Sequence, residues 1–140
     1  MKTSSKARYA LYLVVDIATH EDTGPVSLRE VAGRHDISIK FLEQIAGELG
    51  RAGYLKSVRG ASGGYLLAQD SASITAGDIM RAAEGGFLPV SCLDGAAESC
   101  PRHGGTNGKG GCCKMSSFWY GLRTTLDDYL DSVSIASLTT

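Results

Sequence analysis

Four cysteines are the residues of this chain best suited to carry chemistry. Cys92 and Cys100 lie within a glycine-rich segment, 85–111, and Cys112 and Cys113 follow it directly. Thiolates bind soft metals or react with oxidants, and in a reducing compartment four cysteines indicate metal or redox chemistry more than structural disulfides. The segment is too polar and too rich in glycine to form a core of its own, so we expect a bound group to order it.

A second glycine-rich stretch reads VRGASGGY over residues 58–65. Glycine permits the tight reversal of a β-hairpin and lets the backbone approach a partner closely. Arg59 would lie at the tip of such a hairpin, where it could enter a DNA groove or bind a phosphate. This stretch therefore predicts a nucleic-acid contact.

The elements before the hairpin follow a helix-turn-helix pattern. Gly24-Pro25 ends a first helix, the segment 27–30 reads as a capping box for a second, and Ser38 can cap a third. We expect helices over 6–20, 27–34 and 38–49, the last ended by Gly50 and Gly53, and strands over 54–58 and 65–69. The predicted fold is α+β, mainly α: a winged helix-turn-helix, in which residues at the start of the third helix meet base edges.

The C-terminal part of the chain predicts a long dimerisation helix. A capped helix is expected from Thr75 to Glu84, and another over 116–132. The second carries an apolar stripe at helical spacing: Phe118, Leu122, Leu126, Tyr129 and Val133. The stripe could pack on its own domain, but the body is small, so we favour pairing with a second copy. A homodimer would present two recognition helices to a pseudo-palindromic operator.

These features divide the chain into a DNA-binding domain (1–84), a sensor loop (85–115), and the dimerisation helix with its tail (116–140). The net charge of −1 is not that of a strongly basic nucleic-acid binder, but residues 1–60 hold nine basic side chains against seven acidic ones. No apolar run is long enough to span a bilayer, and the amphipathic stretch 9–17 is not a signal peptide, so we expect a cytoplasmic protein without a membrane partner. No nucleophile elbow, phosphate loop or paired-carboxylate arrangement occurs, so we do not expect an enzyme.

In combination, these motifs resemble the Rrf2 family of winged-helix transcription regulators over nearly the whole chain. The matching segments are KARYAL (6–11), VSL (26–28), FLEQ (41–44), LKSVRG (55–60), GGY (63–65) and IT-GD (74–78). The resemblance implies a homodimeric regulator, expected to be a repressor, with the third helix in the major groove and the wing in the minor groove of double-stranded DNA. It assigns the DNA contacts to Ser38, Lys40, Phe41, Glu43, Gln44, Arg59 and Gly60.

The resemblance also implies an iron–sulfur cluster. In cluster-binding members three cysteines follow the Thr-x-Gly-Asp helix, and Cys92, Cys100 and Cys113 occupy those places here. Thiolates are the ligands that such clusters require, whether of the 2Fe–2S or the 4Fe–4S type. The fourth ligand is unassigned, with Cys112 and His103 as candidates within the loop.

This sequence departs from the family pattern around the cysteines. Their spacing is longer than usual, and Ser116 and Arg8 stand where members can have a ligating histidine or carboxylate. Two alternatives to the cluster sensor therefore stay open. One is a cluster-free repressor that responds to thiols or metabolites and acts with a metabolic enzyme as partner; the other is a zinc-binding regulator.

Overall fold

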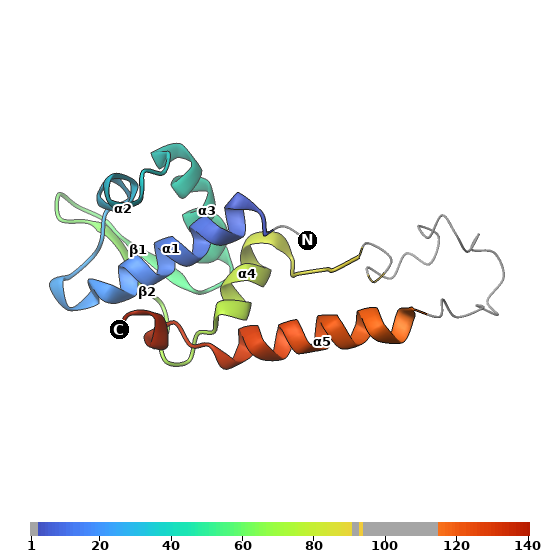
Figure 1. Cartoon of the computed structure of the whole chain (residues 1–140). Coiled ribbons are helices and arrows are strands. Elements are labelled where there is room, and N and C mark those ends of the chain that lie inside the picture. Colours follow the sequence, from blue (N-terminus) through green and yellow to red (C-terminus); the bar gives the residue numbers. More distant parts are fainter. Residues whose placement is uncertain (1–2, 91–92, 94–114) are drawn as a thin grey trace.

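The computed structural model describes residues 3–90, 93 and 115–140, which form a mainly helical α+β fold (Figure 1). The helices are α1 (Ser5–Thr19), η1 (Glu21–Thr23), α2 (Leu28–His35), α3 (Ile39–Arg51), α4 (Ala76–Glu84), α5 (Ser116–Ser132) and η4 (Ala136–Leu138). The strands β1 (Leu55–Val58) and β2 (Gly64–Leu67) pair antiparallel, with Leu55 opposite Leu67. The predicted winged helix-turn-helix is confirmed, and each predicted helix lies within a few residues of its expected bounds.

Side-chain caps mark the beginnings of α2 and α3. The predicted capping box is present at α2, where the Ser27 hydroxyl accepts from the Glu30 amide and the Glu30 carboxylate accepts from the Ser27 amide. Ser38 accepts from the Phe41 amide at the start of α3, as expected. The predicted end of α3 was wrong in one respect. Gly50 lies inside the helix, and only Gly53, with φ of 86°, takes the left-handed conformation that favours glycine beyond a helix end.

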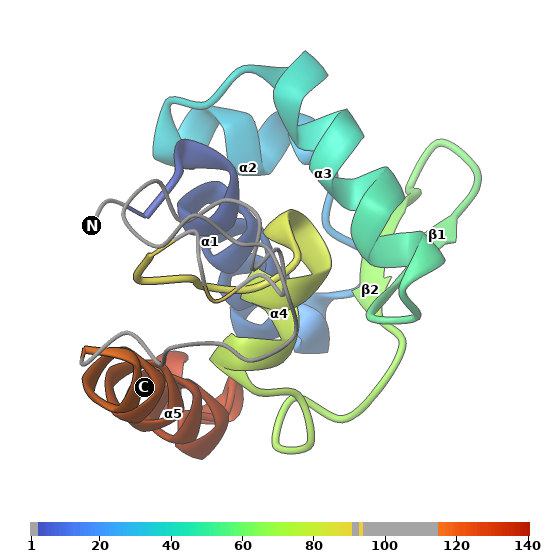
Figure 2. The same ribbon diagram turned by 90° about the vertical axis from the view of Figure 1, so that its right-hand side faces the viewer.

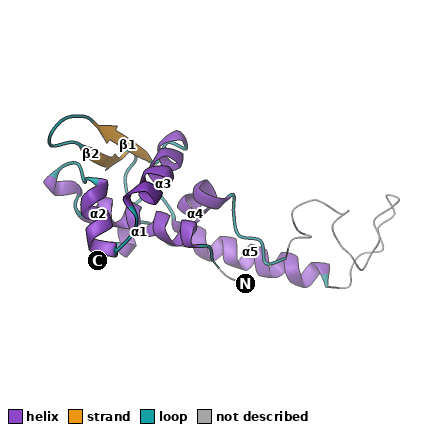
Figure 3. Ribbon diagram, turned by 90° about the horizontal axis from the view of Figure 1, so that it is seen from above, coloured by secondary structure: helices purple, strands orange, loops and turns teal. Residues whose placement is uncertain are grey.

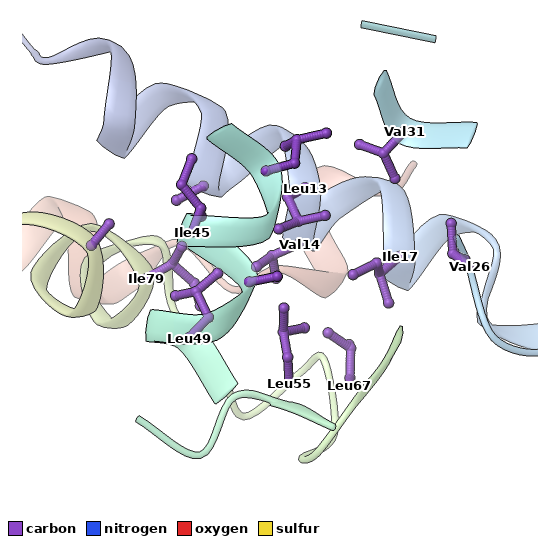
Figure 4. Close-up of a cluster of buried hydrophobic side chains, with 14 of the residues drawn as sticks. Leu13, Val14, Ile17, Val26, Val31, Ile45, Leu49, Leu55, Leu67 and Ile79 are labelled. Carbon is purple, nitrogen blue, oxygen red and sulfur yellow. The ribbon is translucent and has the colours of Figure 1, made fainter. Parts of the chain in front are cut away.

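The core is organised around α1, which lies between the other elements (Figure 4). Leu13, Val14 and Ile17 are fully buried at helical spacing on one face of α1. They pack with side chains from α3, α4 and the hairpin: Leu42, Ile45, Leu49, Ile79, Leu55 and Leu67. Burial of each such side chain contributes roughly 1.5–3 kcal/mol to the stability of the fold. These buried side chains therefore hold the helix-turn-helix and the hairpin on one core.

The hairpin is tied to the segment before α2 by a short additional bridge. The amides of Val26 and Tyr65 each donate to the other's carbonyl, at 3.0 and 2.8 Å. At Gly64 the two backbones are so close that an added Cβ would lie 2.4 Å from the Val26 carbonyl oxygen. Glycine is therefore required at position 64 for the close approach of the two backbones. Glycine is also favoured at Gly60 in the turn, where φ is 118°.

Helix α5 extends away from the body, while the residues after it return to the body (Figures 1 and 2). Ile135 is fully buried in the core, and its amide donates to the Ile74 carbonyl at 2.8 Å. An ion pair joins Arg81 of α4 to Asp131 of α5, which fixes the C-terminal end of the long helix. The division at residue 116 stays a prediction, but the tail after α5 packs as part of the winged domain.

Candidate nucleic-acid interface

The first two turns of α3 present a polar face to solvent. Lys40, Glu43 and Gln44 are exposed at positions that share one side of a helix, and Ser38 is exposed at the cap. The opposite side of α3 is buried through Leu42, Ile45, Ala46 and Leu49. Because the buried side fixes the rotation of the helix on α1, the core determines which side chains of α3 face outward.

Phe41 is placed differently from the other predicted contacts of α3. Its side chain is half-buried, and its ring meets that of Tyr9 of α1 edge to face, with centroids 5.6 Å apart. Aromatic pairs of this geometry stabilise a helix contact beyond the area they bury. Phe41 therefore fixes the start of α3 on α1, and its predicted contact with DNA stays a prediction.

The wing lies beside α3 (Figure 3). Arg59 and Gly60 are exposed at its tip, where the Gly63 amide closes the turn by donating to the Gly60 carbonyl at 3.0 Å. An added Cβ at Gly63 would lie 2.2 Å from the Val58 carbonyl oxygen, so the turn also needs glycine there. In Figure 2, α4 lies near the centre of the molecule. The helix α3 and the hairpin lie on one side of α4, and α5 lies on the opposite side. The structure thus brings the predicted α3 and wing residues to one side of the molecule.

Two of the basic residues counted in the N-terminal half are paired within the fold. Lys6 donates to Glu48 of α3 at 2.8 Å, and Arg34 of α2 donates to Asp16 of α1. Lys40 and Arg59 are exposed, and neither has an ion-pair partner in the described part of the chain. The side with α3 and the wing therefore keeps positive charge for phosphates, although less than the sequence count suggests.

Asp16 forms a polar cluster that the sequence patterns did not reveal. Its side chain is only 3% exposed, and its carboxylate accepts from Arg34 Nε at 2.8 Å and from His35 Nε2 at 2.8 Å. His20 Nδ1 lies 3.2 Å from the same carboxylate and 2.8 Å from the Asp16 carbonyl oxygen. Desolvation by burial raises the pKa of Asp16, but the hydrogen bonds from Arg34 and His35 outweigh it and hold the pKa below its ordinary value.

This cluster joins α2 to α1 and so helps to set the position of the helix-turn-helix. His20 and His35, which stand at the ends of α1 and α2, each contact the buried carboxylate. The available signal was an acidic residue at position 16, within the buried apolar face of α1 formed by Leu13 and Ile17. A carboxylate in such a position needs partners from another element.

The predicted metal ligands Cys92, Cys100, Cys113, Cys112 and His103 all lie outside the described residues. Within the described ranges, no group of three histidine, cysteine, aspartate or glutamate side chains could hold a metal ion. The same ranges contain no helix that is both long and apolar enough to cross a bilayer. The cysteine assignments stay predictions.

The fold and the exposed faces of α3 and the wing define a winged helix-turn-helix protein of the DNA-binding class. Residues 3–140 match the Rrf2 family, described as iron-dependent transcriptional regulators, and the chain belongs to this family. Its relatives are named as transcriptional regulators, a class without enzymatic activity.

Individual relatives and a solved structure support this family assignment. The chain is 33% identical to the regulator IscR of Klebsiella pneumoniae, over 99% of this chain and 79% of that protein. It is 35% identical to the regulator CymR of Bacillus subtilis, over 99% of this chain and 89% of that protein. The structure of that CymR, described as a global cysteine regulator, superposes with a TM-score of 0.79 at 33% identity, over 99% of this chain and 96% of the other. The chain is thus similar to IscR and to CymR to much the same degree.

Proposed function

We propose that this protein is a repressor that binds a pseudo-palindromic operator as a homodimer and whose affinity for DNA is controlled by an iron–sulfur cluster. The observation that carries the DNA-binding part is that α3, on which Lys40, Glu43 and Gln44 are exposed, lies beside the wing, at whose tip Arg59 is exposed. With α3 in the major groove, the adjacent wing would reach the neighbouring minor groove.

The side chains on the α3 face suit different base edges. Glu43 can accept from a cytosine amino group, Gln44 can pair with an adenine edge, and Lys40 can bind guanine or phosphate. Ser38 lies at the helix N-terminus, where hydroxyl and backbone N–H groups favour a phosphate. Arg59, with Gly60 beside it, would enter the minor groove. This set predicts both sequence readout and backbone contacts.

Exposed aromatic residues on α5 support the dimer. Phe118 is 55% exposed and Tyr129 is 67% exposed, on the stripe that the sequence predicts for subunit pairing. Apolar side chains of this size on a helix that extends from the body are typical of a surface covered by another chain. A two-fold dimer would place two α3 helices on successive major grooves, so half-sites about ten base pairs apart are expected.

The donor set in the cysteine segment fits a cluster. Cys92, Cys100 and Cys113 supply three thiolates, and Cys112 or His103 would supply the fourth ligand. When bound, an iron–sulfur cluster would supply a centre sensitive to oxidants and to iron supply. The protein's own contribution is positional, because the segment joins the end of α4 to the start of α5, and the Arg81–Asp131 ion pair links those helices at the other end of α5. A group bound by this segment would therefore constrain α5 relative to the DNA-binding body.

A second function is supported by the similarity to CymR. In this alternative the cysteines hold no cluster, and the protein is a thiol- or metabolite-responsive repressor that acts with a metabolic enzyme; zinc binding is the third option. Iron, acid-labile sulfide and zinc per subunit in anaerobically purified protein separate the three. Equal iron and sulfide, lost in Cys92→Ala, supports the cluster. Absence of iron with titratable thiols supports the alternative, and zinc alone supports the third.

Substitution of Arg59 tests the DNA-binding proposal. An operator duplex is first selected from a random library with the full-length protein, and affinity is then measured by fluorescence anisotropy at several salt concentrations. Arg59→Ala is expected to weaken binding at least tenfold and to reduce the slope of log affinity against log salt by about one, because one phosphate or groove contact is lost. The control Arg123→Ala removes the same charge from α5, on the other side of the molecule, and should leave the slope unchanged. Equal effects of the two variants would contradict the assignment of the wing.

A further inference from the structure

The outward side of α3 continues beyond its first two turns, and the next position on it is a glycine. Gly47 follows Gln44 by three residues and Glu43 by four, so it shares the side of the helix on which these exposed side chains lie. The buried residues Leu42, Ile45 and Leu49 are each about half a turn away around the helix axis. Gly47 therefore lies at the middle of the side of α3 that faces away from the core.

Among the described residues, no neighbour requires glycine at position 47. Its φ is not in the left-handed region, and an added Cβ would meet only Nη1 of Arg51, at an ordinary contact distance of 3.6 Å. At Gly63 and Gly64, in contrast, an added Cβ would collide with backbone atoms. Glycine inside a helix lowers the stability of the helix relative to alanine. The missing side chain thus brings no advantage to the fold, which points to a partner that approaches α3 closely at this position.

Arg51 supplies a positive charge beside Gly47. It follows Gly47 by four residues, is exposed, and directs its guanidinium over the Gly47 backbone. The nearest acidic side chain along α3 is that of Glu48, which is paired with Lys6 instead. Within the described part of the chain, Arg51 has no ion-pair partner. Its guanidinium therefore remains available to a phosphate, whose oxygens match its donors.

The dimensions of DNA fit this arrangement. An α-helix rises about 1.5 Å per residue, so Gly47 lies about 10 Å along the helix from Lys40, and Arg51 lies about 16 Å from it. The major groove is about 12 Å wide. With Lys40 at the base edges and α3 inclined across the groove, Gly47 would still lie inside the groove. Arg51 would reach the phosphates that border it.

We propose that Gly47 lets the middle of α3 approach the base edges closely and that Arg51 binds a phosphate at the border of the same groove. Gly47 is thus a positioning residue for the base contacts of Lys40, Glu43 and Gln44. This role rests on the proposed function in DNA binding and extends the interface to the whole outward side of α3. A side chain at position 47 would hold the helix away from the floor of the groove, so contacts with bases would be lost before contacts with phosphates.

Fluorescence anisotropy with two duplexes tests the proposal, one being the selected operator and the other a duplex of unrelated sequence. Gly47→Ala is expected to weaken operator binding at least fivefold and binding of the unrelated duplex less than twofold, because nonspecific binding depends on phosphates. Gly47→Leu should weaken operator binding at least fiftyfold, since its side chain is longer. Arg51→Gln should weaken both duplexes at least threefold and reduce the slope of log affinity against log salt by about one.

The matched control is Gly33→Ala, at an exposed position of α2 with open space around it. Both alanine variants should raise the urea midpoint of unfolding, and only Gly47→Ala should lose operator affinity. A lower midpoint for Gly47→Ala would show that the fold itself needs this glycine and would overturn the proposal. Operator affinity equal to that of the wild type would also overturn it, and an unchanged salt slope for Arg51→Gln would overturn the phosphate contact. In these cases the wild type still binds its operator, so the proposed function stands. A wild type that bound no duplex from the library would refute the proposed function, and the role of Gly47 with it.

Discussion

Replacing Asp16 with asparagine removes a buried negative charge and keeps the shape of the side chain. The carboxylate is 3% exposed and accepts two hydrogen bonds from Arg34 and one from His35. Hydrogen bonds to charged groups contribute about 1.5–3 kcal/mol each when they are buried. Arg34 and His35 are 38% and 32% exposed, so water replaces part of what they lose, and the amide oxygen of asparagine can still accept one bond.

We therefore expect Asp16→Asn to lower the free energy of unfolding by about 2 kcal/mol at pH 7. In urea this corresponds to a decrease of about 1 M in the midpoint of unfolding, measured by circular dichroism at equal subunit concentration. Asp128→Asn is the control, because Asp128 is exposed on α5. A midpoint change for Asp16→Asn no larger than that of the control would refute the role of the cluster in holding α2 on α1.

The pH dependence gives an independent check of the same reasoning. The folded-state pKa of Asp16 is lowered from its ordinary value near 3.8, so the stability that its ionised form contributes is complete above that value and is lost as the pH falls through the folded pKa. The difference in stability between the wild type and Asp16→Asn should therefore be constant at neutral pH and should shrink below about pH 4. A difference that stays constant on acidification would show that the ionised carboxylate is not the stabilising group.

Two further predictions concern the wing and the tail. Gly64→Ala should destabilise the protein by about 1–3 kcal/mol and weaken operator binding, because the added Cβ would lie 2.4 Å from the Val26 carbonyl oxygen. The control is Gly33→Ala, at an exposed helix position with open space around it, which should stabilise the protein by about 0.5–1 kcal/mol. Thermal unfolding of the two variants tests the difference. Ile135→Ala should cost about 2–5 kcal/mol because the side chain is fully buried. Leu138→Ala, at a side chain that is 43% exposed, should change the urea midpoint little, and a similar loss for both would contradict the packing of the tail described here.

The sequence determined the elements and much of the candidate interface, because their signals act over a few residues. The cap residues Ser27, Ser38 and Thr75 correctly predict where α2, α3 and α4 begin. The glycines around Arg59 predict the hairpin. Since helix and turn geometry relate these residues to their near neighbours alone, the exposed face of α3 follows from the buried one.

Only the tertiary structure decided which distant residues meet. Asp16, Arg34 and His35 come together because α2 packs on α1, and no spacing rule within the sequence relates them. The contact of Gly64 with the Val26 backbone and the burial of Ile135 likewise depend on chain segments that return after long connections. Partners for a buried charge, close backbone approach and the filling of a core are fixed by three-dimensional packing, so these features could not be derived from local pattern.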